Sequence, residues 1–150
     1  MKQIIVAAVV CLTGIPALAS EDGIIKIRAD ADVGATMDRL EAAVTNAGAT
    51  IFARVDHAAG AQSVDMSLDP AELLVFGNPQ LGTPAIQDDP LAGLYLPLRV
   101  LVYQDVEGQV WLAYDDPEQM FDDLAIPDDA DYIERMSEAL TNLTGAAASD

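Results

Sequence analysis

Four side chains in this sequence are candidates for chemistry at a shared site: His57, Asn78, Thr83 and Arg99. His57 is the single histidine of the chain, and it follows Asp56 at the end of a predicted strand, where side chains often reach a cleft. An imidazole ordinarily changes protonation near neutral pH, which suits it to proton transfer. The alternative is that His57 fills a polar gap beside the sheet. Adjacent strand residues point to opposite faces, so Asp56 and His57 are not expected to touch.

A metal site built on His57 alone lacks ligands. Zinc and copper sites usually combine several His or Cys side chains, and this chain has one histidine and one cysteine. His57 could still bind a metal ion together with Asp or Glu, particularly if a homo-oligomer brings two copies of the histidine together. His57 is therefore the metal-ligand candidate, and the sequence assigns no cofactor.

Asn78 and Thr83 lie in a connection rich in glycine and proline, Gly77-Asn78-Pro79 and Gly82-Thr83-Pro84. The connection follows a predicted central strand, at the kind of sheet edge where α/β proteins bind ligands. It is not a phosphate loop, because no Gly-Lys-Ser or Gly-Lys-Thr follows and the prolines lack the N–H donors that phosphate needs. The alternative is a rigid turn that only orders the chain. Asn78 and Thr83 are its ligand-binding candidates.

Arg99 alternates with Leu98 and Val100 in a predicted strand, so we expect it on the sheet face opposite to theirs. An arginine there could bind a carboxylate ligand or pair with an acidic neighbour, and in so acidic a chain the internal ion pair is favoured. The sequence has no nucleophile elbow and no convincing Ser-His-Asp order. It carries no positive signature of an enzyme.

Several phrases of the sequence resemble one protein family. They are Phe76-Gly77-Asn78-Pro79, Gly82-Thr83-Pro84, the run from Pro97 to Tyr103, and Val55-Asp56-His57-Ala58. Together they resemble the bacterial and archaeal domain of unknown function 302, over about residues 23–125. The resemblance implies a compact α+β domain and makes the Asp-His pair part of the family motif, but it implies no reaction and no substrate.

The N-terminus predicts export. Lys2 precedes an apolar run from Ile4 to Leu12, and Ala17-Leu18-Ala19 is a small-x-small cleavage site. We therefore expect a signal peptide over residues 1–19 and a periplasmic or secreted protein. Cleavage after Ala19 removes Cys11, which excludes thiolate chemistry from the mature chain. No later segment is long and apolar enough to span a membrane, so we expect no membrane association after cleavage.

The charge of the chain narrows its partners. The formal net charge is −18, with 25 Asp and Glu against seven Lys and Arg. A nucleic-acid surface needs clustered cations, whereas the Lys and Arg here are scattered singly. Nucleic acid and anionic lipid are therefore excluded as partners. The remaining partners are a small molecule, a metal ion or further copies of the chain.

The periodicity of apolar residues predicts a single α+β domain over residues 20–143. It predicts strands at residues 23–29, 50–55, 72–76, 98–103 and 109–114, and helices at 33–47, 117–124 and 131–143. A strand-helix-strand unit and a hairpin predict two layers, a mixed sheet of about five strands packed against helices. The helix at 131–143 lies outside the family-like core, and residues 144–150 are expected to form a disordered tail.

Three functions remain open at this point. The first is a periplasmic accessory protein that binds a small ligand or a metal ion near His57, Asn78, Thr83 and Arg99. The second is a small enzyme with His57 as general base and Arg99 holding an anionic substrate. The third is a structural or interaction role as a homo-oligomer.

Overall fold

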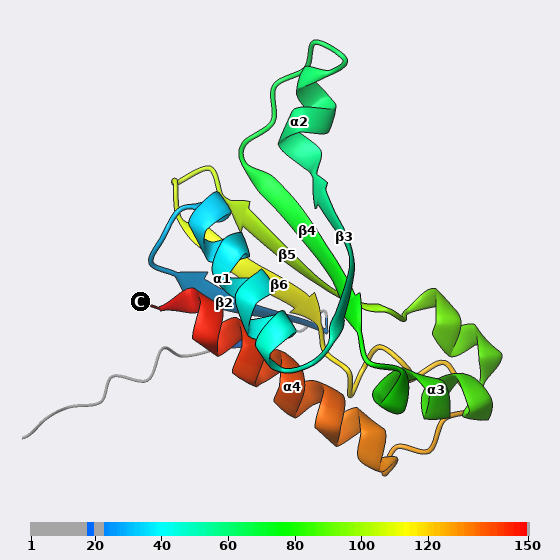
Figure 1. Ribbon diagram of the computed structural model, residues 1–150. Coiled ribbons are helices and arrows are strands. Elements are labelled where there is room, and N and C mark those ends of the chain that lie inside the picture. The colour runs from blue at the N-terminus through cyan, green and yellow to red at the C-terminus, as the bar shows by residue number, and fades with distance from the viewer. Residues whose placement is uncertain (1–17, 20–22, 150) are drawn as a thin grey trace, which may run out of the picture.

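A computed structural model describes residues 18–19 and 23–149 (Figure 1). They form a six-stranded sheet in the order β1-β2-β6-β5-β4-β3, and every neighbouring pair is antiparallel. The strands are β1 (Leu18–Ala19), β2 (Ile24–Ala29), β3 (Thr50–Asp56), β4 (Ala71–Gly77), β5 (Leu98–Gln104) and β6 (Val110–Asp115). The helices are α1 (Val33–Asn46), α2 (His57–Gln62), α3 (Pro79–Asp88), the 3₁₀ helix η1 (Pro90–Leu94) and α4 (Asp131–Ala148).

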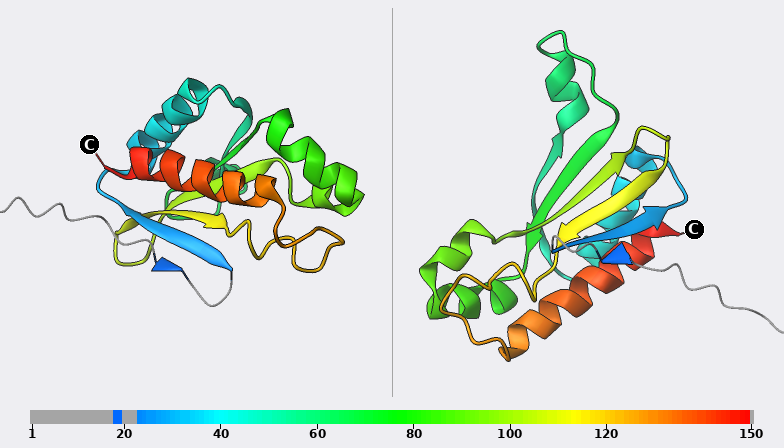
Figure 2. Two further views of the ribbon diagram at one scale, coloured as in Figure 1. Left: turned by 90° about the horizontal axis from the view of Figure 1, so that it is seen from below. Right: turned by 180° about the vertical axis from the view of Figure 1, so that it is seen from behind.

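The fold has two layers. Helices α1 and α4 lie side by side on one face of the sheet, and α3 lies beyond the sheet end on the same side (Figure 2). No helix in the described part of the chain covers the other face, which we call the open face. The predicted two-layer α+β domain is therefore confirmed.

The predicted mixed sheet is wrong. The strand-helix-strand unit β2-α1-β3 is present, but β6, β5 and β4 lie between β2 and β3, and every neighbouring pair in the sheet is antiparallel. Helix α1 instead carries the chain across the whole covered face. Local periodicity shows that a strand-helix-strand unit is present, but it does not show how many strands the crossover spans.

Helix α1 forms as its sequence predicts. The side chain of Asp32 accepts a hydrogen bond from the backbone N–H of Ala35 at 2.8 Å, which caps the first turn. Gly48 follows the helix with a φ of 75°, a left-handed conformation that glycine adopts without strain. The helix buries Val33, Met37 and other apolar residues at helical spacing against the sheet.

The C-terminal prediction was too short. Helix α4 does not stop at residue 143 but continues to Ala148, so the disordered tail expected at 144–150 is wrong for residues 144–148. Thr144, Ala147 and Ala148 are buried, and the N–H of Asp30 donates to the carbonyl of Ala148 at 3.0 Å. Small residues look like a tail in sequence, yet here their size allows α4 to pack closely on its neighbours.

The predicted helix at 117–124 is also wrong, because this segment is a series of turns. Its backbone N–H groups mostly bond three residues back, as in Asp122 to Gln119 at 3.2 Å and Leu124 to Phe121 at 2.9 Å. The N–H of Ala125 donates to the carboxylate of Asp89 at 3.0 Å, which draws the end of the segment away from a helical path.

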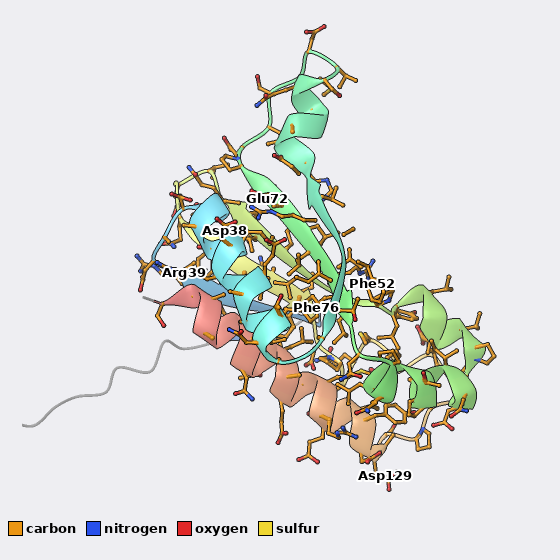
Figure 3. The ribbon with its side chains drawn as sticks, in the orientation of Figure 1. Asp38, Arg39, Phe52, Glu72, Phe76 and Asp129 are labelled. Carbon is orange, nitrogen blue, oxygen red and sulfur yellow. The ribbon has the colours of Figure 1, made fainter. Side chains whose placement is uncertain are left out.

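An arginine joins the edge strand β3 to α1. The Arg54 guanidinium bonds Asp38 at 2.7 Å and Glu41 at 3.2 Å, both on α1, and also bonds Glu72 on β4. Figure 3 shows Glu72 and Asp38 together at this end of the covered face. The hydrogen bond with Glu72 is the main cause that raises the pKa of Arg54 above its ordinary value, and Asp38 and Glu41 add to it.

Residues 57–70 form an arm that projects from the end of the sheet between β3 and β4 (Figure 1). The arm contains α2 and the loop that returns to β4. No residue of α2 is buried. The carboxylate of Asp56 caps α2 by accepting from the N–H of Ala59 at 2.8 Å.

The predicted signal peptide, residues 1–19, lies outside the described residues except for Leu18 and Ala19, which pair with β2. Within residues 18–19 and 23–149, none of the helices combines the length and hydropathy needed to cross a bilayer.

Candidate functional site

An apolar pocket opens at the sheet end that lies opposite to the arm, between α3, α4 and the ends of β3 and β4. Its volume is about 260 Å³. We call it the α3 pocket. It is lined by Phe52, Gly77, Asn78, Pro79, Leu81, Gly82, Thr83, Ile86, Leu96, Pro97, Leu98 and Met136.

The lining of the α3 pocket is uncharged, and Asn78 and Thr83 supply its polar side chains. Met136 and Leu98 are buried, whereas Phe52 is 57% exposed and Ile86 is 41% exposed. Phe52 lies on β3 at the side that faces α3 (Figure 3). The pocket therefore has a buried apolar floor and an apolar rim that is open to solvent.

The start of α3 explains why its residues line a pocket. Asn78 is the N-cap, and its Oδ1 accepts from the N–H of Gln80 at 2.9 Å. Pro79 follows at the first helical position, where the missing N–H costs no hydrogen bond. The motif thus begins a helix, and in doing so it fixes one wall of the pocket. In the described part of the chain, Nδ2 of Asn78 has no hydrogen-bond partner.

Three hydrogen bonds to Asp88 and Asp89 hold the chain at the far end of α3. The hydroxyl of Tyr132 on α4 donates to Asp88 at 2.7 Å. Burial of the phenol, with the Asp88 carboxylate beside it, raises the pKa of Tyr132 to about 12. Asp89 accepts from the N–H of Ala125 at 3.0 Å and from that of Leu91 at 2.9 Å, and these bonds lower the pKa of its carboxyl group.

Of the four residues predicted from the sequence, the structure brings Asn78 and Thr83 together in the α3 pocket. His57 begins α2 on the arm and is exposed. Because β3 and β4 are each seven residues long, His57 and Asn78 are separated by roughly 20 Å along the sheet. His57 therefore does not contribute to this pocket.

Arg99 lies on the open face and also away from the α3 pocket. Its guanidinium bonds the carboxylate of Asp115 at 3.3 Å, the internal pair that the sequence favoured. It borders a separate shallow hollow of about 200 Å³ whose lining includes Leu73, Leu101 and Ala113. The shared site expected for all four residues is thus divided over three places in the fold.

Several lining residues were not found by sequence reasoning. Phe52, Leu96 and Met136 come from three distant segments, and each reads as a core residue in the sequence. A β-bulge between Ile51 and Ala53 interrupts the alternation of β3 at Phe52. The sequence alternates regularly through this stretch, so it gave no signal of the bulge or of the role of Phe52.

The metal-site hypothesis gains no ligand set here. In the part of the chain that the structure describes, no three or more His, Cys, Asp and Glu side chains are grouped so that they could hold a metal ion.

The family model described as "Domain of unknown function DUF302" matches residues 25–145. The chain belongs to the DUF302 family. The match confirms the resemblance seen in the sequence and extends it across most of α4, which we had placed outside the family core.

Curated relatives include the fluoride-specific ion channel FluC 1 of Brucella suis and FluC 1 of Brucella abortus. Each is 41% identical over 104 residues, which is 68% of this chain. The match covers 41% of the first relative and 38% of the second. This DUF302 chain therefore spans about two fifths of their length.

A solved structure gives the same fold. An uncharacterised DUF302 protein from Bacillus stearothermophilus has a TM-score of 0.76 and 17% identity to this chain. The similarity covers 84% of this chain and 98% of the other. The fold therefore makes up nearly the whole of that protein.

Proposed function

We propose that this DUF302 protein is a periplasmic or secreted accessory protein that binds a small, uncharged and largely apolar molecule in the α3 pocket. The apolar part of the ligand would lie on Met136 and Leu98, and a polar group would meet Asn78 and Thr83.

One observation carries this proposal. Residues of both motifs that the sequence singled out, Gly77-Asn78-Pro79 and Gly82-Thr83, lie on one hollow. Apolar walls with a few polar groups are typical of small-molecule sites. A volume of about 260 Å³ lies just below the roughly 300–1,000 Å³ that is typical of such sites, so the ligand should be small.

Electrostatics favours a neutral ligand. The chain carries a formal charge of −18, which repels anions. No charged side chain lines the pocket to offset that repulsion. A metal ion or small carboxylate, both considered from the sequence, would find no matching ligand there.

The Brucella relatives support an accessory role. In them the matched region is about two fifths of a protein named as a fluoride-specific ion channel. Since the fold forms nearly the whole of the Bacillus stearothermophilus protein, we propose that it is an independent module attached to the channel part in those relatives. The module would then serve a membrane process by binding a ligand, without conducting ions itself.

The enzyme hypothesis has less support. It required His57 as base and Arg99 as anchor for one substrate, but His57 is on the arm and Arg99 is on the open face near the opposite end of β5. No observation places a second catalytic group beside either residue.

A fragment screen tests the proposed function. Purified protein is exposed to a panel of neutral aromatic and aliphatic alcohols and amides, and binding is followed by amide NMR shifts and thermal unfolding. A ligand of the α3 pocket should shift the signals of Gly77, Asn78 and Gly82 and raise the melting temperature. Thr83→Phe, which fills the pocket mouth, should abolish both effects.

The matched control is Thr45→Phe, an equal change at an exposed position of α1. It should leave binding intact. If no fragment shifts the pocket signals, or if Thr83→Phe binds as well as Thr45→Phe does, the proposed function is wrong.

A further inference from the structure

The open face of the sheet is apolar at its centre. The pairing of Leu73 with Leu101, and of Leu101 with Ala113, places these three side chains in one row across β4, β5 and β6. They are partly exposed, whereas the alternating residues Val100 and Val102 are fully buried under the helices. An apolar sheet face left open in this way is typical of an interaction surface.

The open face also gathers cations in an acidic protein. Of the chain's seven Lys and Arg residues, Lys2 lies outside the described residues, and three of the other six, Lys26, Arg28 and Arg99, have their strand positions on this face. The one acidic strand position on the face is Asp115, which pairs with Arg99. Within the described residues, Lys26 and Arg28 form no salt bridge. An occupant of this face should therefore be both apolar and acidic.

The arm has that complementary character. Its segment Val64-Asp65-Met66-Ser67-Leu68-Asp69 alternates apolar with polar residues, and the whole arm has no Lys or Arg. Val64 is 64% exposed, Met66 65% and Leu68 52%. Three large apolar side chains on one protrusion are unfavourable in water unless another surface covers them.

We propose that the protein forms a two-fold dimer in which the arm of each copy lies across the open face of the other. Val64, Met66 and Leu68 would contact the row formed by Leu73, Leu101 and Ala113. Asp65 and Asp69 would lie near Lys26 and Arg28. A two-fold axis repeats the contact twice and closes the assembly.

The dimensions agree with this arrangement. Val64 and Asp65 lie in the turn after α2, and residues 66–69 continue from it over about 13 Å. The row formed by Leu73, Leu101 and Ala113 crosses three strands and is about 10 Å long. Five strands about 20 Å long and about 4.8 Å apart present a face on the order of 500 Å². Together with the arm, each copy approaches the roughly 800 Å² that a stable interface needs.

Sedimentation equilibrium of the purified chain tests the dimer. The protein should be a dimer at micromolar concentration, and Met66→Asp and Leu101→Asp should each make it a monomer. Leu94→Asp is the control, because Leu94 is 75% exposed on η1, away from both surfaces, and this variant should stay dimeric. A monomeric native chain, or a dimer that survives both Met66→Asp and Leu101→Asp, would overturn the proposal.

A charge exchange tests the pairing of arm with face. One variant carries Asp65→Lys and Asp69→Lys, and a second carries Lys26→Glu and Arg28→Glu. Each should be a folded monomer by itself, since its arm and face repel. Mixed together, they should form a heterodimer, because each arm then meets a face of opposite charge. Two folded monomers that do not associate on mixing would overturn the proposed contact between the arm and the open face.

Discussion

Tyr132 on α4 donates its hydroxyl to the carboxylate of Asp88 at the end of α3, at 2.7 Å. Tyr132 is only 5% exposed, whereas its partner Asp88 is exposed. The bond therefore forms at the boundary between the core and the surface. Since α3 forms one wall of the α3 pocket, this contact helps to hold that wall against α4.

Removing the hydroxyl should loosen α3. We expect Tyr132→Phe to lower the free energy of unfolding by about 1–2 kcal/mol, because a hydrogen bond to a charged group is lost and Asp88 loses its partner. The melting temperature should fall by about 3–8 °C. Tyr103→Phe is the control, since the Tyr103 hydroxyl forms no hydrogen bond within the described residues, and it should melt like the native protein. Equal melting of both variants would contradict this role.

The raised pKa of Tyr132 predicts that the protein loses stability at alkaline pH. The pKa of Tyr132 is raised in the folded protein from 10.0 to about 12. A raised pKa gives stability that is fully present below pH 10 and is lost as the pH rises towards 12. Urea unfolding across this range should show a steeper decline for the native protein than for Tyr132→Phe. Parallel declines would mean that Tyr132 titrates like a solvated phenol.

Trp111, the chain's only tryptophan, reports on the β5-β6 hairpin. Its indole N–H donates to Asp105 at 2.8 Å, and this bond is the main cause that lowers the pKa of Asp105 from 3.8. A lowered pKa gives stability that is present above pH 3.8 and is lost as the pH falls through the lower value. Trp111 fluorescence should therefore change below pH 3.8, before far-UV circular dichroism does. The transition should vanish in Asp105→Asn and persist in Asp128→Asn, which alters an exposed loop.

The guanidinium of Arg54 is expected to stabilise the edge of the sheet. Arg54→Met would leave Asp38, Glu41 and Glu72 close together without their cation. We expect a loss of about 1–3 kcal/mol in urea unfolding at low salt, partly recovered at high salt as the repulsion is screened. Arg54→Lys should be more stable than Arg54→Met but less stable than the native protein, because an ammonium group cannot match the fork geometry of the guanidinium. Arg135→Met, an exposed change on α4, should have little effect.

Sequence patterns predicted the elements of this fold better than their arrangement. Alternation in β5 correctly placed Leu98 and Val100 under the helices and Arg99 on the opposite face. The order of the strands was not available from such patterns, because it depends on which strands pair across long stretches of chain. The mixed sheet was inferred from a local unit, and its error came from pairing that is not local.

The candidate site was likewise predicted where residues are close in the sequence and missed where they are distant. Asn78 and Thr83 are five residues apart at the start of α3, and this closeness in the sequence sufficed to place both on one pocket. His57 and Arg99 were grouped with them because their side chains could do related chemistry. The type of a side chain does not show where it lies in the fold. The floor residue Met136 belongs to α4, and only packing shows that it meets Leu98 in the pocket.

A substitution at Gly82 should change the stability of the protein and its ligand binding at the α3 pocket in opposite directions. A Cβ at this position would lie 3.6 Å from Cδ1 of Leu96, an ordinary van der Waals distance, so alanine fits. Gly82→Ala should stabilise α3 by about 0.5–1 kcal/mol, since alanine is the better helix former. The added methyl also narrows the pocket. Overpacking by one methyl costs on the order of 1 kcal/mol, so the Kd of a fragment that fills the pocket should rise about fivefold.

The control for Gly82→Ala is Gly145→Ala on α4, where a Cβ would meet nothing within 4 Å. It adds the same helix preference at a position that does not line the pocket, so it should raise the melting temperature without changing the Kd. A general loosening of the protein would weaken binding and lower stability together. Gly82→Ala is expected to weaken binding while raising stability, and that combination can arise only if the ligand lies against α3. Unchanged binding in Gly82→Ala would place the ligand elsewhere.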